Sequence, residues 1–384
     1  MLSLRDALES ALVENPDDLA THYAYADYLQ ELGDPRGEFI QLQLALEDPR
    51  RSESERRKLQ ARAKELLHEH EREWLGILAD ELLLPTEVTG WSFSVPDPHP
   101  EYHFARGWLD SFILRDVAGC LRRTELGPLL CLAQEARLLR KLVLEYDDGL
   151  IEALRDSPFL RNLRVFQLGR PRSGDYFPNV SSPISSPIVA DLIANLPRIE
   201  ELRLFVKAYN AFRLFALANL TSLRILQVYY LGERYHLEIL AANPALGNLT
   251  HLLLHPQAFA APLIDLTGVR AIVKSRHLRS LTHLQLHRSD LGDVGCTEIV
   301  TSGILKRLKV LDLRHGEISD TGARILADCP ELRGLELLDI ERNALTQMGI
   351  DMLRRVLGPA LRGDNQQTPE ELGRRQYLYD EAFA

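Results

Sequence analysis

The 384-residue sequence lacks several features that define large classes of proteins. It has no apolar run near the ~20 residues that cross a lipid bilayer. Its only cysteines are Cys120, Cys131, Cys296 and Cys329, without a CxxC pair, so we expect neither a disulfide framework nor a closed zinc site. Basic residues are not in excess, since 45 Lys and Arg face 55 Asp and Glu. The resulting net charge of -10 argues against a general nucleic-acid binder.

Signals for secretion and for common catalytic chemistry are missing too. The opening "MLSLRDALESALVENPDD" carries Asp6, Glu9 and Glu14, whereas a secretion signal is basic and then apolar. No G-x-x-x-x-G-K-[ST], G-x-G-x-x-G or H-E-x-x-H motif occurs. The "HEHE" at 68–71 lies in a charged helical stretch, where alternate residues diverge. We therefore expect a cytoplasmic protein without cofactor, metal or catalytic residues, with a monomer as the default oligomeric state.

Helical patterns fill the first 84 residues. Ser3 is placed to cap a first helix, with Asp6 at the capping-box position and an apolar stripe at helical spacing behind it. Interleaved Glu and Lys/Arg with an apolar face predict one long charged helix, or two, near the end of this region. The predicted helices after the first cover 19–32, 37–48 and 52 to about 84.

One stretch in this region, "YADYLQELGDPRGEFIQLQ" at 25–43, resembles the repeat-companion module known in bacteria. The pattern of that module is close to Y-A-D-W-L-E-E-x-G-D-P-R-x-E-F-I-x-L-Q, and Tyr28 stands where Trp is commoner. The resemblance implies a repeat domain downstream and no known chemistry. We interpret 34–37 as a turn in which Asp34 or Arg36 bonds helix ends. A partner-binding role for these polar residues is the alternative.

Downstream, the pattern L-x-x-L-x-L recurs nine times, with first positions 30, 24, 36, 24, 26, 32, 27 and 27 residues apart. Each unit predicts a short strand whose alternate leucine side chains point into the core, followed by a helix packed behind it. One unit cannot bury its own apolar face, so the units must stack. The first positions are Leu109, Leu139, Leu163, Ile199, Leu223, Leu249, Leu281, Leu308 and Leu335.

These units resemble the leucine-rich repeat family, in particular its ribonuclease-inhibitor-like type, over about 108–358. The resemblance implies an α/β solenoid, with a curved parallel sheet inside and helices outside, preceded by the small all-α module. Gly295, Gly322 and Gly349 fall 27 residues apart, just before each predicted helix. The family usually has Asn eight places after the first Leu, and only Asn343 keeps it, so we expect the first five units to be distorted. Cys296 and Cys329 fall on helical segments and are predicted to be core residues.

Two stretches interrupt the repeats. The Pro-, Ser- and Gly-rich segment 169–187 is predicted to be a surface loop, and 85–107 joins the helical module to the first strand. Trp91, Phe93 and Trp108 are candidates to cover the open end of the solenoid core. We therefore predict a helical module at 1–84, a linker and N-terminal cap at 85–107, a repeat domain at 108–358 and a capping tail at 359–384, with a helix near 368–383.

Histidines recur at the third and seventh places of two units, which alternate with the buried leucines and face the inner surface of the sheet. "LTHLLLH" (249–255) and "LTHLQLH" (281–287) put His251, His255, His283 and His287 into a two-by-two patch on neighbouring strands. Adjacent strands lie ~4.8 Å apart and four residues along a strand span roughly 13 Å. His255 with His287, or His251 with His283, can therefore share a ligand, but all four cannot bind one ion. Two imidazoles leave a zinc site short of its usual three or four ligands.

The same register defines a candidate partner-binding surface on the inner face, at the third, fifth and seventh places of each unit. Aromatic rings beside Arg, His and acids are a usual mixture for a surface that binds proteins. Our candidates are Arg203, Phe205, Gln227, Tyr229, His251, His255, His283, Gln285, His287, Asp312, Arg314, Asp339 and Glu341.

Three functions are consistent with the sequence. The favoured one is a non-enzymatic protein-interaction module that binds an unknown protein partner on the concave face of the repeats, with neither nucleic acid nor membrane as a partner. The second is a metal-binding or hydrolytic protein that uses the histidine patch. The third is a structural or regulatory scaffold without a dedicated pocket.

Overall fold

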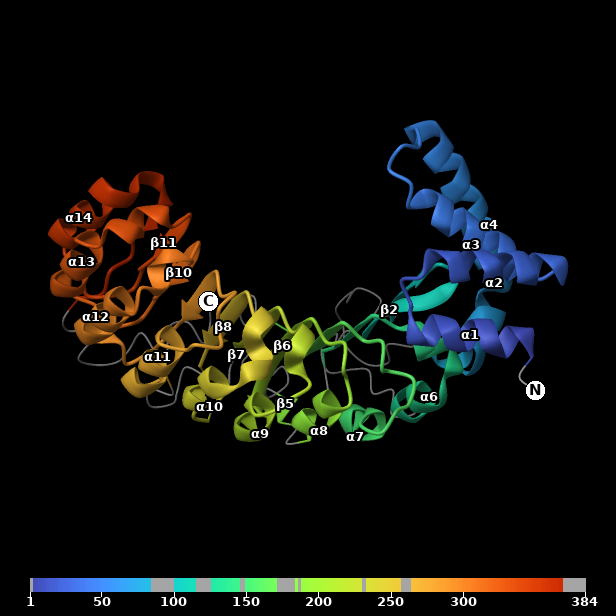
Figure 1. Cartoon of the computed structure of the whole chain (residues 1–384), viewed down its shortest axis with the longest axis horizontal. Helices are drawn as coiled ribbons and strands as arrows, with labels where there is room; N and C mark the ends of the chain where they lie inside the picture. Colours follow the sequence, from blue (N-terminus) through green and yellow to red (C-terminus); the bar gives the residue numbers. More distant parts are fainter. Residues whose placement is uncertain are drawn as a thin grey trace, which may run out of the picture. The chain divides into compact units, whose positions relative to one another are not determined.

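The computed structural model describes residues 3–83, 100–114, 126–145, 149–170, 184–185, 188–229, 233–256 and 264–368. The chain divides into two compact units, Met1–Phe166 (unit 1) and Gln167–Ala384 (unit 2). In Figure 1, unit 1 runs from blue to green and unit 2 from green to red.

Helices make up the first part of unit 1. The predicted capping box is confirmed, because Ser3 Oγ accepts from Asp6 N at 3.1 Å while the Asp6 carboxylate accepts from Ser3 N. The stretch at 34–37 is a helix N-terminus and not the predicted turn, since Asp34 is the N-cap and Pro35 the first helical residue. The helices are α1 (Leu4–Glu14), α2 (Leu19–Glu31), α3 (Pro35–Leu46), α4 (Glu53–Leu75) and α5 (Ala79–Leu83).

A β-hairpin follows that the sequence did not predict. β1 (Glu101–Ala105) pairs antiparallel with β2 (Trp108–Leu114), the first predicted repeat strand. Arg106 and Gly107 form the turn, both with positive φ (51° and 77°). Trp91 and Phe93 lie outside the described residues. The remaining elements of the unit are α6 (Leu126–Leu132), β3 (Lys141–Leu144), which pairs parallel with β2, α7 (Leu150–Leu154) and the start of β4 (Val165–Leu168).

The stretch that resembles the companion module docks on this hairpin through its polar side chains. Arg36 donates from Nε to the Gly107 carbonyl at 2.9 Å, and its guanidinium lies 4.7 Å from the centroid of the Trp108 ring. Gln43 donates from Nε2 to the Phe104 carbonyl at 2.7 Å and accepts from Gly107 N at 2.6 Å. Arg36 therefore bonds the hairpin turn and not a helix end.

A buried cluster continues this contact into the repeats of unit 1. Tyr25 stacks on Trp108, with ring centroids 5.7 Å apart, and donates its hydroxyl to Glu9 at 2.6 Å. Arg137 donates to Glu9 at 2.7 Å and lies 5.3 Å from the centroid of Trp108. Burial alone would raise the pKa of Glu9, but the bonds from Tyr25, Arg5 and Arg137 hold it below its usual value. The helical module thus covers Trp108, at the start of the first repeat strand.

Unit 2 repeats a strand and a helix, with the strands parallel in the order β6 to β12 and β5 beside β6. The strands are β5 (Ile184–Ser185), β6 (Glu201–Ala208), β7 (Ile225–Tyr229), β8 (His251–His255), β9 (His283–Leu286), β10 (Val310–Asp312), β11 (Leu337–Asp339) and β12 (Leu361–Arg362). The helices are α8 (Val189–Ala194), α9 (Ala211–Phe215), α10 (Leu237–Ala242), α11 (Leu266–Val273), α12 (Gly292–Ser302), α13 (Asp320–Ala327) and α14 (Gln347–Leu357).

The predicted leucine pattern forms the core of this unit. The middle leucines of six repeats pair side by side across β6 to β11 and are fully buried or nearly so. Full burial of one such side chain contributes about 1.5–3 kcal/mol relative to exposure. The chain therefore folds as an α/β leucine-rich repeat solenoid with outer helices, preceded by a small all-α module. These leucines are Leu202, Leu226, Leu252, Leu284, Leu311 and Leu338.

The last repeats are joined by a carboxylate that reaches the next helix. Asp293 Oδ1 accepts from the backbone N–H groups of Ser319 and Gly322, both at 2.9 Å. A Cβ at Gly322 would overlap this carboxylate, and Asp320 with Gly349 repeats the arrangement. The three glycines lie in the first turns of α12, α13 and α14, and not before the helices as predicted. Gly322 and Gly349 leave room for the aspartate of the preceding repeat, whereas a Cβ at Gly295 would meet the Leu291 side chain.

Asn343, at the family's usual Asn position, bonds backbone groups of two neighbouring repeats. Its buried amide accepts from Gly316 N (2.9 Å) and Ile318 N (3.0 Å) and donates to the Leu313 and Ile340 carbonyls (3.0 and 3.1 Å). It therefore satisfies buried backbone groups of two repeats in a tight turn, and Gln366 Nε2 also donates to the Ile340 carbonyl, at 3.0 Å.

The earlier repeats of unit 2 are held differently. Asn219 Nδ2 donates to the Ile193 carbonyl at 2.8 Å and Asn243 Nδ2 to the Phe215 carbonyl at 2.7 Å, and Ser275 makes the corresponding bond. The helices α8, α9 and α10 have six, five and six residues, against eleven in α12 and α14. The expected distortion is therefore seen in the helices, while β6, β7 and β8 pair without a register shift.

Two sequence predictions concern segments that are only partly described. Of the predicted loop at 169–187, residues 184–185 form β5 and pair with β6, so a short strand lies inside it. Of the predicted tail, Leu361–Arg362 form β12 beside β11. The helix predicted near 368–383 lies outside the described residues, apart from Thr368.

Candidate functional site

The candidate surface is the face of β6 to β11 opposite the outer helices of unit 2. In Figure 1 the sheet of this unit bends with the strands inside and the helices outside, so we call this face the concave face. Strand pairing aligns Arg203 with Gln227, Tyr229 with His255 and Gln285 with Asp312. Strand pairing therefore places these candidate residues on one face of the sheet, and a role of the thirteen candidates in binding stays a prediction.

Burial divides the thirteen residues into two groups. Seven are half-buried, namely Arg203, Tyr229, His251, His255, His283, Arg314 and Glu341. The other six are buried, because their side chains pack and bond between neighbouring strands. These buried residues are Phe205, Gln227, Gln285, His287, Asp312 and Asp339.

Aromatic rings at the seventh places form a ladder across four strands. The ring centroids of Phe205 and Tyr229 lie 5.5 Å apart, those of Tyr229 and His255 5.2 Å, and those of His255 and His287 4.8 Å. Two of these contacts are edge-on, the geometry that ring quadrupoles favour. The ladder gives this edge of the concave face a rigid row of flat side chains.

A chain of polar contacts runs beneath the ladder. Tyr229 donates to Gln285 Oε1 at 3.0 Å, Gln285 Nε2 lies 3.2 Å from His287 Nδ1, and His287 Nε2 lies 2.8 Å from Asp312 Oδ2. Because a carboxylate only accepts, Nε2 of His287 carries a proton, and the Gln285 amide lies beside Nδ1. His255 Nδ1 lies 3.2 Å from the same nitrogen. Asp312 therefore sets the orientation of the buried imidazole.

Carboxylates outnumber cations at the last two strands. Arg314 donates to Asp312 at 2.9 and 3.2 Å and lies 3.5 Å from Asp339. Burial alone would raise the pKa of Asp312, but His287 and Arg314 hold that pKa below its usual value. Burial, reinforced by a neighbouring carboxylate, raises the pKa of Asp339 and of Glu341. Among the described residues, none forms an ion pair with Glu341.

The repeated Thr-His dipeptide forms a second feature, on β8 and β9. Thr250 donates its hydroxyl to the Arg224 carbonyl at 2.9 Å and therefore accepts from His251 Nδ1 at 2.8 Å. Thr282 and His283 repeat this pair at 2.9 Å. Both rings thus keep Nε2 as an acceptor, and they stack with centroids 3.9 Å apart. Burial lowers the pKa of both histidines, and for His251 the neighbouring His283 adds to this shift.

Apolar residues extend the stacked pair in both directions, and the sequence search for site residues passed over them. Ile225 pairs with His251, and Val310 pairs with both His283 and Leu337, so five third-place residues form one line across five strands. All five are half-buried. We call this line the histidine strip, and its members are Ile225, His251, His283, Val310 and Leu337. The repeat register predicted all five positions, but Ile225, Val310 and Leu337 were not among the candidate site residues.

The arrangement gives no support to a resident metal ion. Among the described residues, no group of three or more His, Cys, Asp or Glu side chains is placed to hold a metal. The two histidine pairs are separate, and Nε2 of His287 already faces Asp312. Each pair offers two nitrogen ligands at most, as the sequence predicted.

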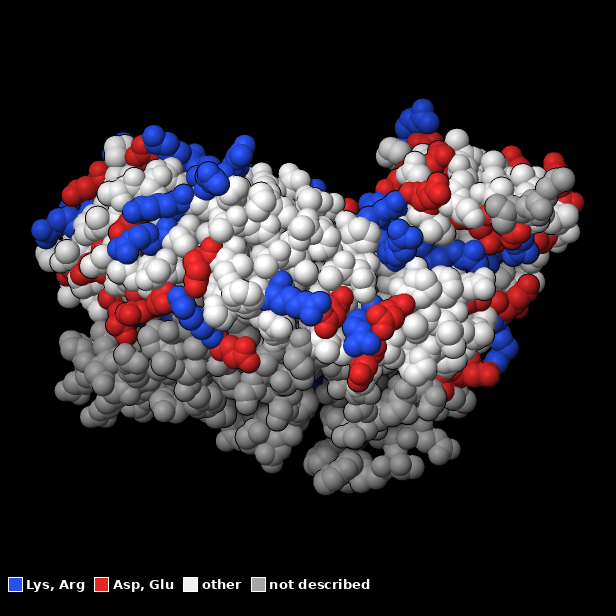
Figure 2. All heavy atoms as spheres, turned by 60° about the horizontal axis from the view of Figure 1, so that its bottom comes forward, with Lys and Arg blue, Asp and Glu red and all other residues white. Residues whose placement is uncertain are grey.

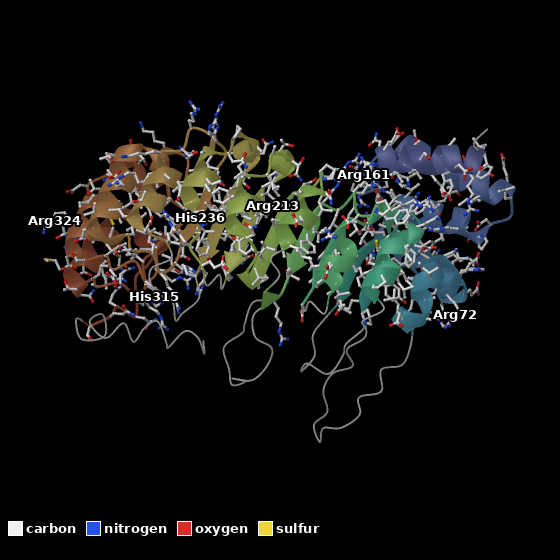
Figure 3. All side chains as sticks on the ribbon, turned by 90° about the horizontal axis from the view of Figure 1, so that it is seen from below. Arg72, Arg161, Arg213, His236, His315 and Arg324 are labelled. Carbon is white, nitrogen blue, oxygen red and sulfur yellow. The ribbon has the colours of Figure 1, made fainter. Side chains whose placement is uncertain are left out.

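The outer helices of unit 2 present a different surface. In Figure 2 acidic and basic side chains lie side by side on these helices. Arg270 and Lys274 both pair with Glu298, at 2.8 and 2.6 Å. Arg213 and Arg324, on α9 and α13, lie on this outer side in Figure 3. Mixed, mutually paired charge of this kind is typical of a solvated surface.

Comparison with known proteins gives fold-level likeness only. No family model matches the chain, and no curated protein matches it. A solved structure of a Bacteroides fragilis protein is similar over 64% of this chain and 71% of that one, at 16% identity and a TM-score of 0.47. An internalin from Listeria monocytogenes (15% identity, 67% and 86% covered) and yeast Rad7 in complex with Elc1 (12%, 63% and 71%) both give TM-scores of 0.33.

These likenesses are too distant to carry an argument, so the fold is assigned from the strand register and the buried leucines. The resemblance of 25–43 to the companion module stays a prediction. Among the described residues, no helix combines the length and hydropathy required to span a membrane.

Proposed function

We propose that this protein is a non-enzymatic interaction module whose unit 2 binds another protein on the concave face. One observation carries the proposal: aromatic, imidazole and aliphatic side chains, most of them half-buried, form continuous rows across neighbouring repeats, next to polar groups that are bonded to one another. Rigid rings with a bonded layer beneath them lose little conformational freedom on binding, which favours affinity.

The contrast with the outer helices supports the choice of face. On the outer helices Arg270 and Lys274 pair with Glu298, whereas the histidine strip is half-buried with apolar side chains, and Glu341 has no ion pair among the described residues. Net charge of -10 and the absence of cysteine pairs support a cytoplasmic protein whose partner is not nucleic acid.

Affinity capture from the native host tests the proposal. Wild type should capture at least one protein that the triple variant Tyr229→Ala/His255→Ala/Arg314→Ala loses. The matched control replaces three exposed residues at equivalent places of α12, α13 and α14, as Val294→Ala/Thr321→Ala/Met348→Ala, and should keep the partner. Circular dichroism confirms that both variants fold. Equal capture by both variants would favour the scaffold alternative, and loss only in the outer variant would place binding on the helices.

Zinc binding tests the metal-binding or hydrolytic alternative. This alternative predicts stoichiometric zinc binding that His255→Ala and His287→Ala abolish. Isothermal titration of the full chain with zinc chloride distinguishes this from the interaction module, which does not require a metal.

A further inference from the structure

The histidine strip has the dimensions of a binding track for a short protein segment. Its five members follow one another on neighbouring strands, which places them ~4.8 Å apart and makes the strip roughly 19 Å long. In an extended segment, side chains on one face recur at roughly 6.7 Å, so about three of them cover the strip. The track is apolar at both ends, with Ile225 at one and Val310 with Leu337 at the other.

The middle of the strip is uncharged near neutral pH. The hydroxyls of Thr250 and Thr282 accept from Nδ1 of His251 and His283, and the two rings stack. Burial lowers the pKa of both rings, so each is neutral near pH 7 and keeps one acceptor nitrogen, Nε2. The pair therefore acts as flat apolar surface that can also accept a hydrogen bond from a partner N–H group.

Charge on the concave face is unbalanced, and the imbalance lies at one end. The third, fifth and seventh places of β6 to β11 hold two arginines and four carboxylates, which gives -2 with neutral histidines. Arg203 is already paired with Glu201 at 3.1 Å, and Arg314 with Asp312. Asp339 and Glu341 are the two remaining carboxylates, and Arg314 also lies 3.5 Å from Asp339. Among the described residues Glu341 has no ion pair, and it lies four residues beyond Leu337 on the last of these repeats. A partner cation is the complement of this end.

We propose that the histidine strip binds a segment of a partner protein that has apolar side chains along the strip and a lysine or arginine that pairs with Glu341. The proposal rests on the proposed function of the concave face and adds the chemistry of the partner. The chain direction of the bound segment is not part of the proposal, because the segment can place a basic residue at the Leu337 end of the strip in either direction.

Selection from a random dodecamer peptide library on the immobilised full chain tests the proposal. Enriched peptides should combine two or three Leu, Ile, Val, Phe or Met residues with an Arg or Lys. Glu341→Lys should weaken binding of a synthetic enriched peptide at least tenfold, measured by fluorescence anisotropy. Asp351→Lys, the same charge change on the outer helix α14, should change binding by less than twofold. A peptide with its basic residue replaced by Glu should regain affinity for Glu341→Lys.

A variant within the strip distinguishes failure of the proposed partner chemistry from failure of the proposed binding face. Val310→Glu should also weaken binding at least tenfold, and Leu337→Ser serves if Val310→Glu fails to fold. If strip variants weaken binding but Glu341→Lys does not, or enriched peptides lack basic residues, the partner chemistry is overturned while the proposed binding face stands. If no peptide is enriched, or enriched peptides bind every concave variant as tightly as wild type, the proposed face is overturned as well.

Discussion

Units 1 and 2 both contain repeat strands, but their polar and aromatic side chains are used in different ways. In unit 1, Arg36, Arg137 and Tyr25 meet on Trp108, so charged and aromatic groups from distant segments form one buried cluster. In unit 2, the corresponding types of side chain contact one another along a single sheet, and most of the residues in the rows on its concave face stay half-buried. A repeat strand therefore carries a buried cluster or a partly exposed face according to whether another element lies on it.

The largest test of this comparison removes the ring at the centre of unit 1. Trp108→Ala should lower the free energy of unfolding by about 3–5 kcal/mol, because a buried aromatic ring leaves a cavity and two guanidinium groups lose their contact. Urea unfolding gives the magnitude, and hydrogen exchange should rise more in α1 to α3 than in β9 to β11. Leu132→Ala, at a residue that is 67% exposed, is the control. Equal deprotection in β9 to β11 would contradict the assignment of Trp108 to the core of unit 1.

The next test concerns the regular end of unit 2. Asn343→Ala should cost about 2–3 kcal/mol, because it leaves several buried backbone groups without a partner. Asn248→Ala removes one exposed bond to the Thr221 carbonyl and should cost less than about 1 kcal/mol. Urea denaturation of both variants checks the difference. Similar losses in the two would mean that the buried amide is not what joins these repeats.

A third test asks whether the concave face is stabilised by its buried network. Asp312→Asn should cost about 1–2 kcal/mol at pH 7, because His287 and Arg314 lose a charged acceptor. The folded pKa of Asp312 is lowered, so its contribution is complete above the ordinary aspartate value near 4 and is lost as pH falls further. The gap between wild type and variant, measured by urea unfolding, should therefore shrink at pH 3. A gap that widens there would show that the carboxylate does not stabilise the fold, and Asp351→Asn is the exposed control.

The smallest effect is expected from the stacked histidines. Their folded pKa values are lowered, so the folded state binds fewer protons than the unfolded state and stability falls as pH drops below about 6.5. The double variant His251→Gln/His283→Gln should remove their part of this dependence, which we expect to be about 0.5 kcal/mol or less because both rings are partly exposed and screened. The part from His22, whose pKa burial also lowers, should remain. Melting temperatures at pH 7.5 and 5.5 measure it. His68→Gln, on the exposed side of α4, should leave the wild-type dependence unchanged.

The sequence allowed much of the architecture to be predicted, and the reasons are local. Leucines at fixed spacing predict strands with one buried face, because alternate side chains of a strand share a face. The pairing of Leu252 with Leu284 agrees with this prediction. The capping box at Ser3 depends on four consecutive residues. Hairpin β1–β2 was missed because its turn, Arg106-Gly107, lacks the usual two-residue signal. The site was predicted as a register, but not which of its members are buried.

His283 and His287 show why the burial of individual site residues could not be predicted from the sequence. His283 and His287 occupy inward places of one strand pattern, yet His283 is half-buried whereas His287 is 4% exposed. The difference arises from Asp312 and His255 on the neighbouring strands, which are far away in sequence. No spacing rule within a single repeat contains this information.

The sequence by itself determined the repeat period, the inward register and the helical module, because each depends on side-chain periodicity or on caps a few residues long. Only the tertiary structure decided that the module covers Trp108, and that Arg288, His315 and Arg342 adopt positive φ between 51° and 57°. Each of these three residues donates its backbone N–H to the chain of the following repeat or of the tail. Hydrogen bonds between repeats favour a backbone conformation that these residue types rarely adopt alone, so it appears only when the neighbouring turn is in place.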